Sequence, residues 1–252
     1  MYYRIYRPYE REIQEIEPYE YLKSDDYCKN REELIRYFQI LQEKIKELFK
    51  YIEPSENNIK VYSLILYELL TDVCIEVENN LRGIMEANGY KSDRFNMSED
   101  YFKLNEVLHL DKYKVKIILK SDIQEICPFE NWSSSVYSPL EWYKAYNDVK
   151  HNRSENIEKA NLIHLLQAFA GLYILLYSQF YEYANCVSSS NTMFLFAEQG
   201  GLIVPNPNNI FEISGKPKWT KGEMYHLSDN KYTKFFEECK NRRCINGTRQ
   251  KD

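Results

Sequence analysis

Apolar positions recur every three to four residues over two long stretches of the chain, and this spacing predicts two amphipathic helices. The first covers about residues 31–51 and the second about residues 59–88. The second ends at Asn88-Gly89, a pair typical of a left-handed helix end. We expect the apolar stripe of the second helix to face the core, because charged positions occupy its other side.

A third helix, over about residues 157–183, carries almost no charge and is apolar nearly all the way round. Its apolar run barely reaches the ~20 residues that a bilayer needs. It also contains the polar side chains His164, Gln167, Ser178 and Gln179. These features favour a buried central helix over a membrane span. A shorter helix is predicted just before it, over residues 139–151, with Pro139 in its first turn.

Short alternating segments predict a minor β component. The stretch YKVKIILK alternates well enough to be a strand, and SDIQEI after it could return as its partner, which gives a small β-hairpin insertion around residues 113–127. The sequence thus predicts a mainly α fold: an N-terminal arm over 1–30, a helical bundle over 31–186, and a mixed strand and loop extension over 187–252. Tyrosines of the arm are expected to pack on the body.

Composition favours a packed helical protein. The chain has 252 residues, of which 44% are hydrophobic, and 8 Gly with 8 Pro are too few for an all-β sandwich. The net charge of −5 gives no bulk attraction for nucleic acid, so any phosphate binding must come from a local cluster.

Cysteine usage indicates a reduced, cytoplasmic setting, because the six cysteines are scattered and no apolar leader-like segment follows Met1. Cys239 and Cys244 have neither a CxxC pair nor a nearby histidine, so we expect no metal site and no cofactor.

The most polar short cluster of the chain lies at the end of the predicted helix 139–151. Asn147 and His151 are four residues apart and therefore share a helix face, with Lys150 and Arg153 beside them. A histidine can move a proton, an amide can orient a phosphate, and cations can stabilise an oxyanion. Glu76, at the edge of the stripe on helix 59–88, could complete such a site.

A purely structural interpretation of these residues stays open. Asn147 could be a buried amide that ties two helices together, and His151 could donate to a carbonyl at the helix end. Glu76 could be a boundary carboxylate paired with a lysine.

The stretch from Tyr146 to His151 resembles the motif of the HEPN superfamily, which has Arg, a polar residue that is often Asn, three residues, and then His. Asn147 and His151 match the polar residue and the histidine, whereas Tyr146 stands at the position of the arginine. The pattern WYxAYNxVKHxR around it and the earlier LYELLTDVCIEVE are similar to HEPN-like bacterial proteins. The resemblance covers about residues 56–185.

The resemblance implies a helical bundle that dimerises and brings two motifs into one RNA-binding or RNA-cleaving cleft. It predicts a metal-independent endoribonuclease of a bacterial toxin or antiviral defence system, with the site made by His151, Asn147, Lys150, Arg153 and Glu76. The alternative is an inactive HEPN-like module that binds RNA, a nucleotide or a protein partner of such a system. We expect Asn147 and His151 to face the central helix or a dimer cleft, near Glu76 or Asn80, and expect no membrane association.

Overall fold

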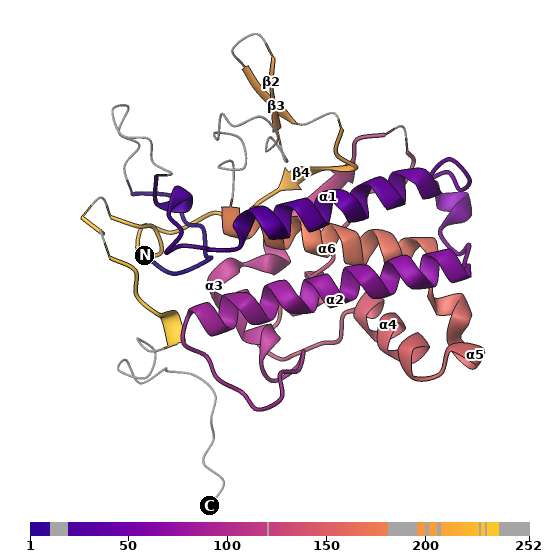
Figure 1. Ribbon diagram of the computed structural model, residues 1–252, viewed down its shortest axis with the longest axis horizontal. Coiled ribbons are helices and arrows are strands. Elements are labelled where there is room, and N and C mark those ends of the chain that lie inside the picture. The colour runs from indigo at the N-terminus through magenta and orange to yellow at the C-terminus, as the bar shows by residue number, and fades with distance from the viewer. Residues whose placement is uncertain are drawn as a thin grey trace, which may run out of the picture.

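The chain folds into a mainly helical structure, as predicted (Figure 1). This computed structural model describes residues 1–10, 20–119, 121–180, 196–199, 202–205, 208–226, 228–229 and 231–236. The α-helices are α1 (Arg31–Leu48), α2 (Leu64–Ala87), α3 (Asn105–Leu108), α4 (Glu141–His151), α5 (Arg153–Asn156) and α6 (Leu162–Phe180). The strands are β1 (Lys114–Ile117), β2 (Phe196–Gln199), β3 (Leu202–Pro205) and β4 (Phe211–Gly215). Short 3-10 turns occur at Glu20–Lys23, Glu56–Asn58, Tyr101–Leu104, Leu110–Lys112, Glu130–Trp132 and Ile157–Lys159.

Helix α2 is defined by capping interactions at both ends. Ser63 caps its start, where the side-chain oxygen accepts a hydrogen bond of 3.1 Å from the backbone N–H of Leu66. At its end Gly89 adopts φ 85°, and the N–H groups of Gly89 and Tyr90 donate back to the carbonyls of Glu86 and Met85. The left-handed end predicted from the Asn-Gly pair is therefore confirmed.

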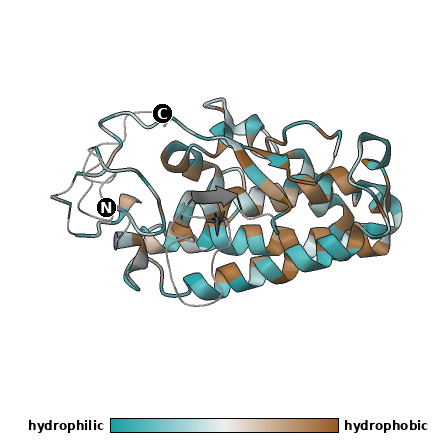
Figure 2. Cartoon of the chain, turned by 90° about the horizontal axis from the view of Figure 1, so that it is seen from above, coloured by the Kyte–Doolittle hydropathy of each residue, from teal (hydrophilic) through white to brown (hydrophobic). Residues whose placement is uncertain are grey.

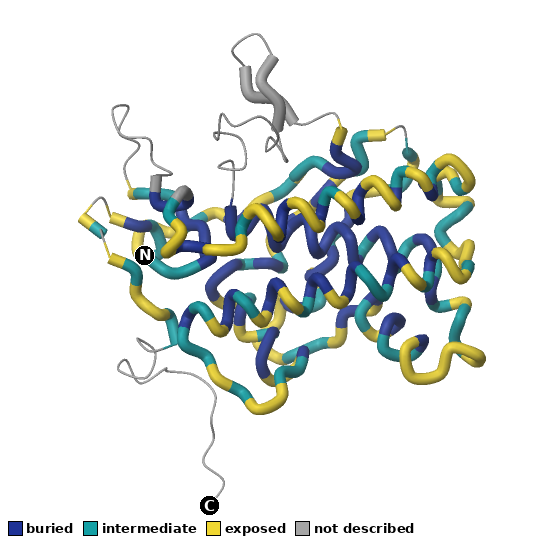
Figure 3. Tube along the Cα trace, in the orientation of Figure 1, coloured by how far each residue is buried: buried dark blue, intermediate teal, exposed yellow. Residues whose placement is uncertain are grey.

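Helix α6 is the centre of the core, as its uniform apolarity predicted. It is long and apolar enough to cross a membrane by length and composition, yet 16 of its 19 residues are buried inside the protein. Figure 2 shows how apolar and polar positions alternate along the long helices, and Figure 3 shows the buried positions of α1 and α2. The rings of Phe38 on α1 and Phe169 on α6 stack with centroids 4.8 Å apart. Gly171 lets the rings of Phe129 and Trp142 pack closely on the helix.

The β-hairpin predicted around residues 113–127 is confirmed only in part. The segment after β1 does return antiparallel, but it forms a single bridge, in which Val115 and Ile126 exchange backbone hydrogen bonds of 3.1 and 2.9 Å. The longer ladder of β1 is formed with β4, also antiparallel. Ile210 and Phe211 are buried at the start of β4, and the Phe211 ring packs on Phe169 of α6 at 5.8 Å. Alternation identified the strand correctly, but it gave no sign of the longer pairing with β4, which depends on the apolar cover that the C-terminal segment provides.

The described parts of the two chain ends pack on each other, and the arm lies on the body as expected. The N–H of Tyr225 donates to the Pro8 carbonyl at 2.9 Å, and the N–H of Tyr6 donates to the Ser178 carbonyl at 3.0 Å. The rings of Tyr21 and Tyr225 meet edge to face at 5.6 Å. Cys239 and Cys244, in the C-terminal extension, lie outside the described residues.

Candidate functional site

Helix α4 presents its last turn to solvent because its other face is anchored in the core. Trp142, Tyr146 and Val149 are buried, and the indole N–H of Trp142 donates to the Pro128 carbonyl at 2.9 Å. The predicted cluster therefore lies at the outer end of a fixed helix.

The two cations of the cluster lie against tyrosine rings. The Lys150 ammonium donates to the hydroxyl of Tyr146 at 3.1 Å and lies 5.0 Å from the centre of that ring. This hydrogen bond raises the pKa of Lys150. The Arg153 guanidinium lies 5.6 Å from the ring centre of Tyr67 on α2. Within the described part of the chain, neither cation forms a salt bridge with a carboxylate. Both charges therefore remain available to an anion.

The lysines on the neighbouring surface are neutralised instead. Asp148 accepts from Lys159 at 2.8 Å, and Lys144 lies 4.0 Å from the same carboxylate. The hydrogen bond from Lys159 lowers the pKa of Asp148. Lys144 and Lys159 are therefore paired with a carboxylate, whereas Lys150 and Arg153 are not.

Tyr146, at the position of the arginine in the HEPN motif, is buried and points into the protein. Burial raises its pKa, so its hydroxyl stays protonated. The neighbouring Tyr143 donates to the Glu78 carboxylate at 3.0 Å, and Asn147 hydrogen-bonds the same tyrosine. Tyr146 thus holds Lys150 in place and is not positioned to contact a phosphate directly.

His151 is exposed at the last residue of α4. Among the described residues its side chain makes no hydrogen bond to a carbonyl, so the proposed anchoring role at the helix end is absent. The half-buried Asn147 hydrogen-bonds Tyr143 of its own helix, and within the described part of the chain its side chain makes no bond to a second helix. Both side chains belong to the outer end of the bundle, away from the apolar core.

The expectation that Glu76 or Asn80 lies beside this cluster is wrong. Glu76 is buried on another side of α2, where its carboxylate accepts from the Asn80 amide at 3.2 Å. The acidic residue of α2 that faces α4 is Glu78, through Tyr143. The prediction assumed a single buried stripe, whereas α2 also contacts α1 and α4, and Glu76 lies in a groove with residues of α1. No described lysine pairs with Glu76 either.

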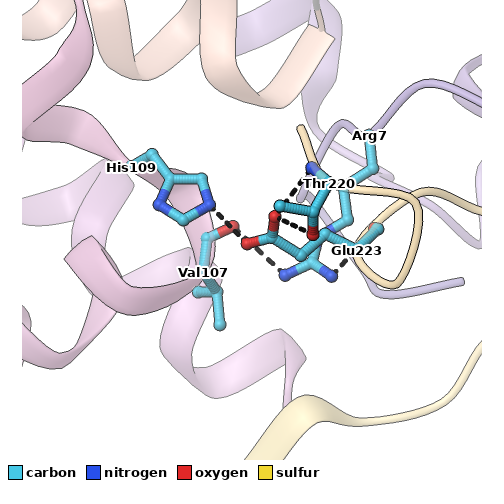
Figure 4. Close-up of polar contacts among 5 residues, drawn as sticks. All are labelled: Arg7, Val107, His109, Thr220 and Glu223. Carbon is cyan, nitrogen blue, oxygen red and sulfur yellow. Dashed lines mark hydrogen bonds and ion pairs between the residues drawn. The ribbon is translucent and has the colours of Figure 1, made fainter. Parts of the chain in front are cut away.

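A second polar cluster, around His109 and Glu223, was not predicted from the sequence. Figure 4 shows His109 and Glu223 facing each other, with the imidazole Nε2 2.7 Å from the carboxylate. The other oxygen of Glu223 accepts from the Thr220 hydroxyl at 2.6 Å and from the Thr220 N–H at 2.9 Å. Burial pushes the pKa of Glu223 upward, but the hydrogen bonds from Thr220 and His109 outweigh it and lower the pKa to about 2.

Arg7 completes this second cluster and links it to the N-terminal arm. Its guanidinium donates to the backbone carbonyls of Glu223 at 3.0 Å and of Val107 at 3.4 Å, as Figure 4 shows. The ring of Trp219 packs against both Arg7 and His109. The cluster fastens the C-terminal segment to the α3 region. No local motif marks these residues, because they come from three distant segments.

In the part of the chain that the structure describes, no group of three His, Cys, Asp or Glu side chains could hold a metal ion. Comparison of the chain with protein-family models, with curated proteins and with solved structures finds no match in any of the three. The HEPN resemblance therefore stays a prediction that rests on the residues quoted above.

Proposed function

We propose that this protein is a HEPN-like helical protein that binds RNA at the end of α4. The observation that supports the proposal most is the pair of cations, Lys150 and Arg153, held on tyrosine rings without a carboxylate partner. Cations placed in this way attract phosphate groups, and they lose little side-chain freedom on binding because the rings already orient them. The local cluster supplies an attraction that the net charge of −5 does not.

Exposed apolar side chains next to the cations extend the proposed surface. Tyr62, Leu64 and Ile65 at the start of α2 are 52%, 59% and 59% exposed. They adjoin the α4 end, because Tyr62 bridges to Asn161 and Arg153 packs on Tyr67. A base can stack on an exposed tyrosine, and an aliphatic patch can join two protomers. We therefore propose a homodimer in which two α4 ends form one cleft, in a cytoplasmic defence or toxin system.

Metal-independent RNA cleavage is a second candidate function, favoured by the exposed imidazole of His151 one turn from Asn147. The 2′-hydroxyl would attack the adjacent phosphorus, form a 2′,3′-cyclic phosphate and release the 5′-oxygen as a hydroxyl. The reaction needs one proton removed from the 2′-hydroxyl and one proton delivered to the departing 5′-oxygen. His151 of one protomer supplies one of these transfers, so the second would come from the other protomer of the proposed dimer.

The test is binding of a fluorescently labelled single-stranded RNA, measured by anisotropy over a range of salt concentrations. We expect Lys150→Ala combined with Arg153→Ala to weaken binding about tenfold or more and to reduce the salt slope by roughly 1 to 2. Lys91→Ala is the matched control for the loss of one positive charge. Lys91 is exposed and lies just after the C-terminal end of α2, whereas the proposed surface adjoins the start of that helix.

Two outcomes would count against RNA binding at α4. One is a wild-type protein without measurable affinity for RNA at low salt. The other is a Lys91→Ala variant that loses as much affinity per charge as the α4 variant, which would indicate general attraction instead of a site.

A further inference from the structure

A second site is indicated by a groove between the first half of α1 and the second half of α2, far from the last turn of α4. Its volume is about 680 Å³, within the range of small-molecule sites. Arg4 of the N-terminal arm and Glu76 of α2 line it, and both are only 7% exposed. Glu33 and Glu86 line the same groove as exposed residues. The groove therefore combines a buried cation with one buried carboxylate and two exposed ones.

Arg4 is a buried guanidinium without a carboxylate partner among the described residues. Its Nε donates to the Gln179 side chain at 2.8 Å and its Nη2 to the Asn80 side chain at 3.4 Å. Burial lowers the pKa of Arg4, which reflects the cost of holding this charge away from water. Its Nη1 has no hydrogen-bond partner in the described part of the chain. An anionic group entering the groove would neutralise the charge and accept from Nη1.

The backbone and the neighbouring helix are both adapted to this placement of Arg4. Its φ of 55° lies in the left-handed region, which is unfavourable for a residue other than glycine. Gly83 makes room for the guanidinium, since a Cβ at that position would lie 2.0 Å from Nη1. Strained residues held by their surroundings cluster at binding sites.

Asn80 keeps Arg4 and Glu76 apart while contacting both. Its Oδ1 accepts from Arg4, and its Nδ2 donates to the Glu76 carboxylate at 3.2 Å. Arg82 also lines the groove, but it is exposed and its guanidinium lies 5.2 Å from the centre of the Phe95 ring. Arg4 is thus the buried cation of the groove, whose lining also holds the three carboxylates of Glu33, Glu76 and Glu86.

We propose that this groove binds a small zwitterion of the basic amino acid class. The carboxylate of the ligand would accept from Nη1 of Arg4, and its ammonium or guanidinium would lie among Glu76, Glu33 and Glu86. The chemistry disfavours nucleotides and other polyphosphates, because three carboxylates would repel them. The proposal is independent of RNA binding at α4 and uses none of the residues of that surface.

The test is calorimetric titration of the full chain with three probes. L-arginine carries both ends, agmatine lacks the carboxylate, and L-norvaline lacks the guanidinium. We expect L-arginine to bind with a Kd of about 0.1–1 mM, in line with a ligand of its size, and each analogue to bind about tenfold more weakly or worse.

Variants locate the site. Arg4→Gln should abolish binding, and Glu86→Gln, a change at an exposed position, should weaken binding of L-arginine about threefold to tenfold. Glu78→Gln is the matched control, because it removes a carboxylate of the same helix outside the groove. Circular dichroism checks that each variant is folded.

The proposal is overturned if L-arginine shows no binding at ~10 mM, a concentration well above the expected Kd. It is also overturned if agmatine and L-norvaline bind as well as L-arginine, or if Glu78→Gln weakens binding as much as Glu86→Gln. Should Arg4→Gln fail to fold, the probes and the Glu86→Gln variant still decide the question.

Discussion

Replacement of Glu223 by Gln should weaken the attachment of the C-terminal segment to the α3 region. The carboxylate accepts three polar contacts of 2.6–2.9 Å, two from Thr220 and one with His109. A glutamine keeps one acceptor oxygen but loses the charge. Hydrogen bonds to charged groups contribute about 1.5–3 kcal/mol. Since the Glu223 side chain is 29% exposed, solvent screening reduces the contribution of these contacts. We therefore expect Glu223→Gln to lower the free energy of unfolding by about 1–2 kcal/mol at neutral pH.

The same contacts predict a definite pH dependence. The folded-state pKa of Glu223, about 2, lies below the ordinary value of 4.5, so folding favours the ionised carboxylate. Its contribution to stability is therefore fully present above about pH 4.5 and is lost as the pH falls toward 2. The difference in unfolding free energy between wild type and Glu223→Gln should shrink over that interval, because the carboxyl of the unfolded chain becomes protonated and folding must then release that proton.

Urea unfolding, followed by circular dichroism at several pH values between 7 and about 3, measures this difference. Glu106→Gln is the matched control, since Glu106 is an exposed carboxylate on α3 and its side chain makes no hydrogen bond or salt bridge within the described residues. It should change stability by no more than about 0.5 kcal/mol at any pH. A Glu223→Gln protein as stable as wild type at neutral pH, or a difference that grows on acidification, would refute the reasoning.

Two further predictions concern single positions. His151→Ala should leave the melting temperature unchanged, because the side chain is exposed. If the protein cleaves RNA in EDTA, this variant should reduce the cleavage rate by ~10²- to 10⁴-fold. Unchanged cleavage by the folded variant would remove His151 from the mechanism. Gly83→Ala should destabilise the fold by about 1–3 kcal/mol, because the new methyl group would overlap the Arg4 guanidinium. Gly222→Ala, with no atom within 4 Å of the added carbon, should be nearly neutral in the same thermal unfolding assay.

The sequence by itself determined the elements whose signals are local. The periodic stripes of α1 and α2, the uniform apolarity of α6 and the pair Asn88-Gly89 each act within a few residues, and the structure has a helix or a helix end at each. The gathering of Asn147, Lys150 and His151 was equally predictable, because one short helix carries all three. Their exposure at its end follows from the buried residues on its other face.

Only the tertiary structure decided which distant segments meet. Strand β1 forms its ladder with β4 and only a single bridge with the adjacent segment, and the side chain of His109 contacts Glu223, more than a hundred positions away. Glu76 joins Arg4 of the arm in one groove, whereas Glu78 turns to α4. Helical periodicity indicates that a face is buried but does not specify what covers it. Which segment covers a buried face depends on the fold of the whole chain, because all the apolar faces must be buried together.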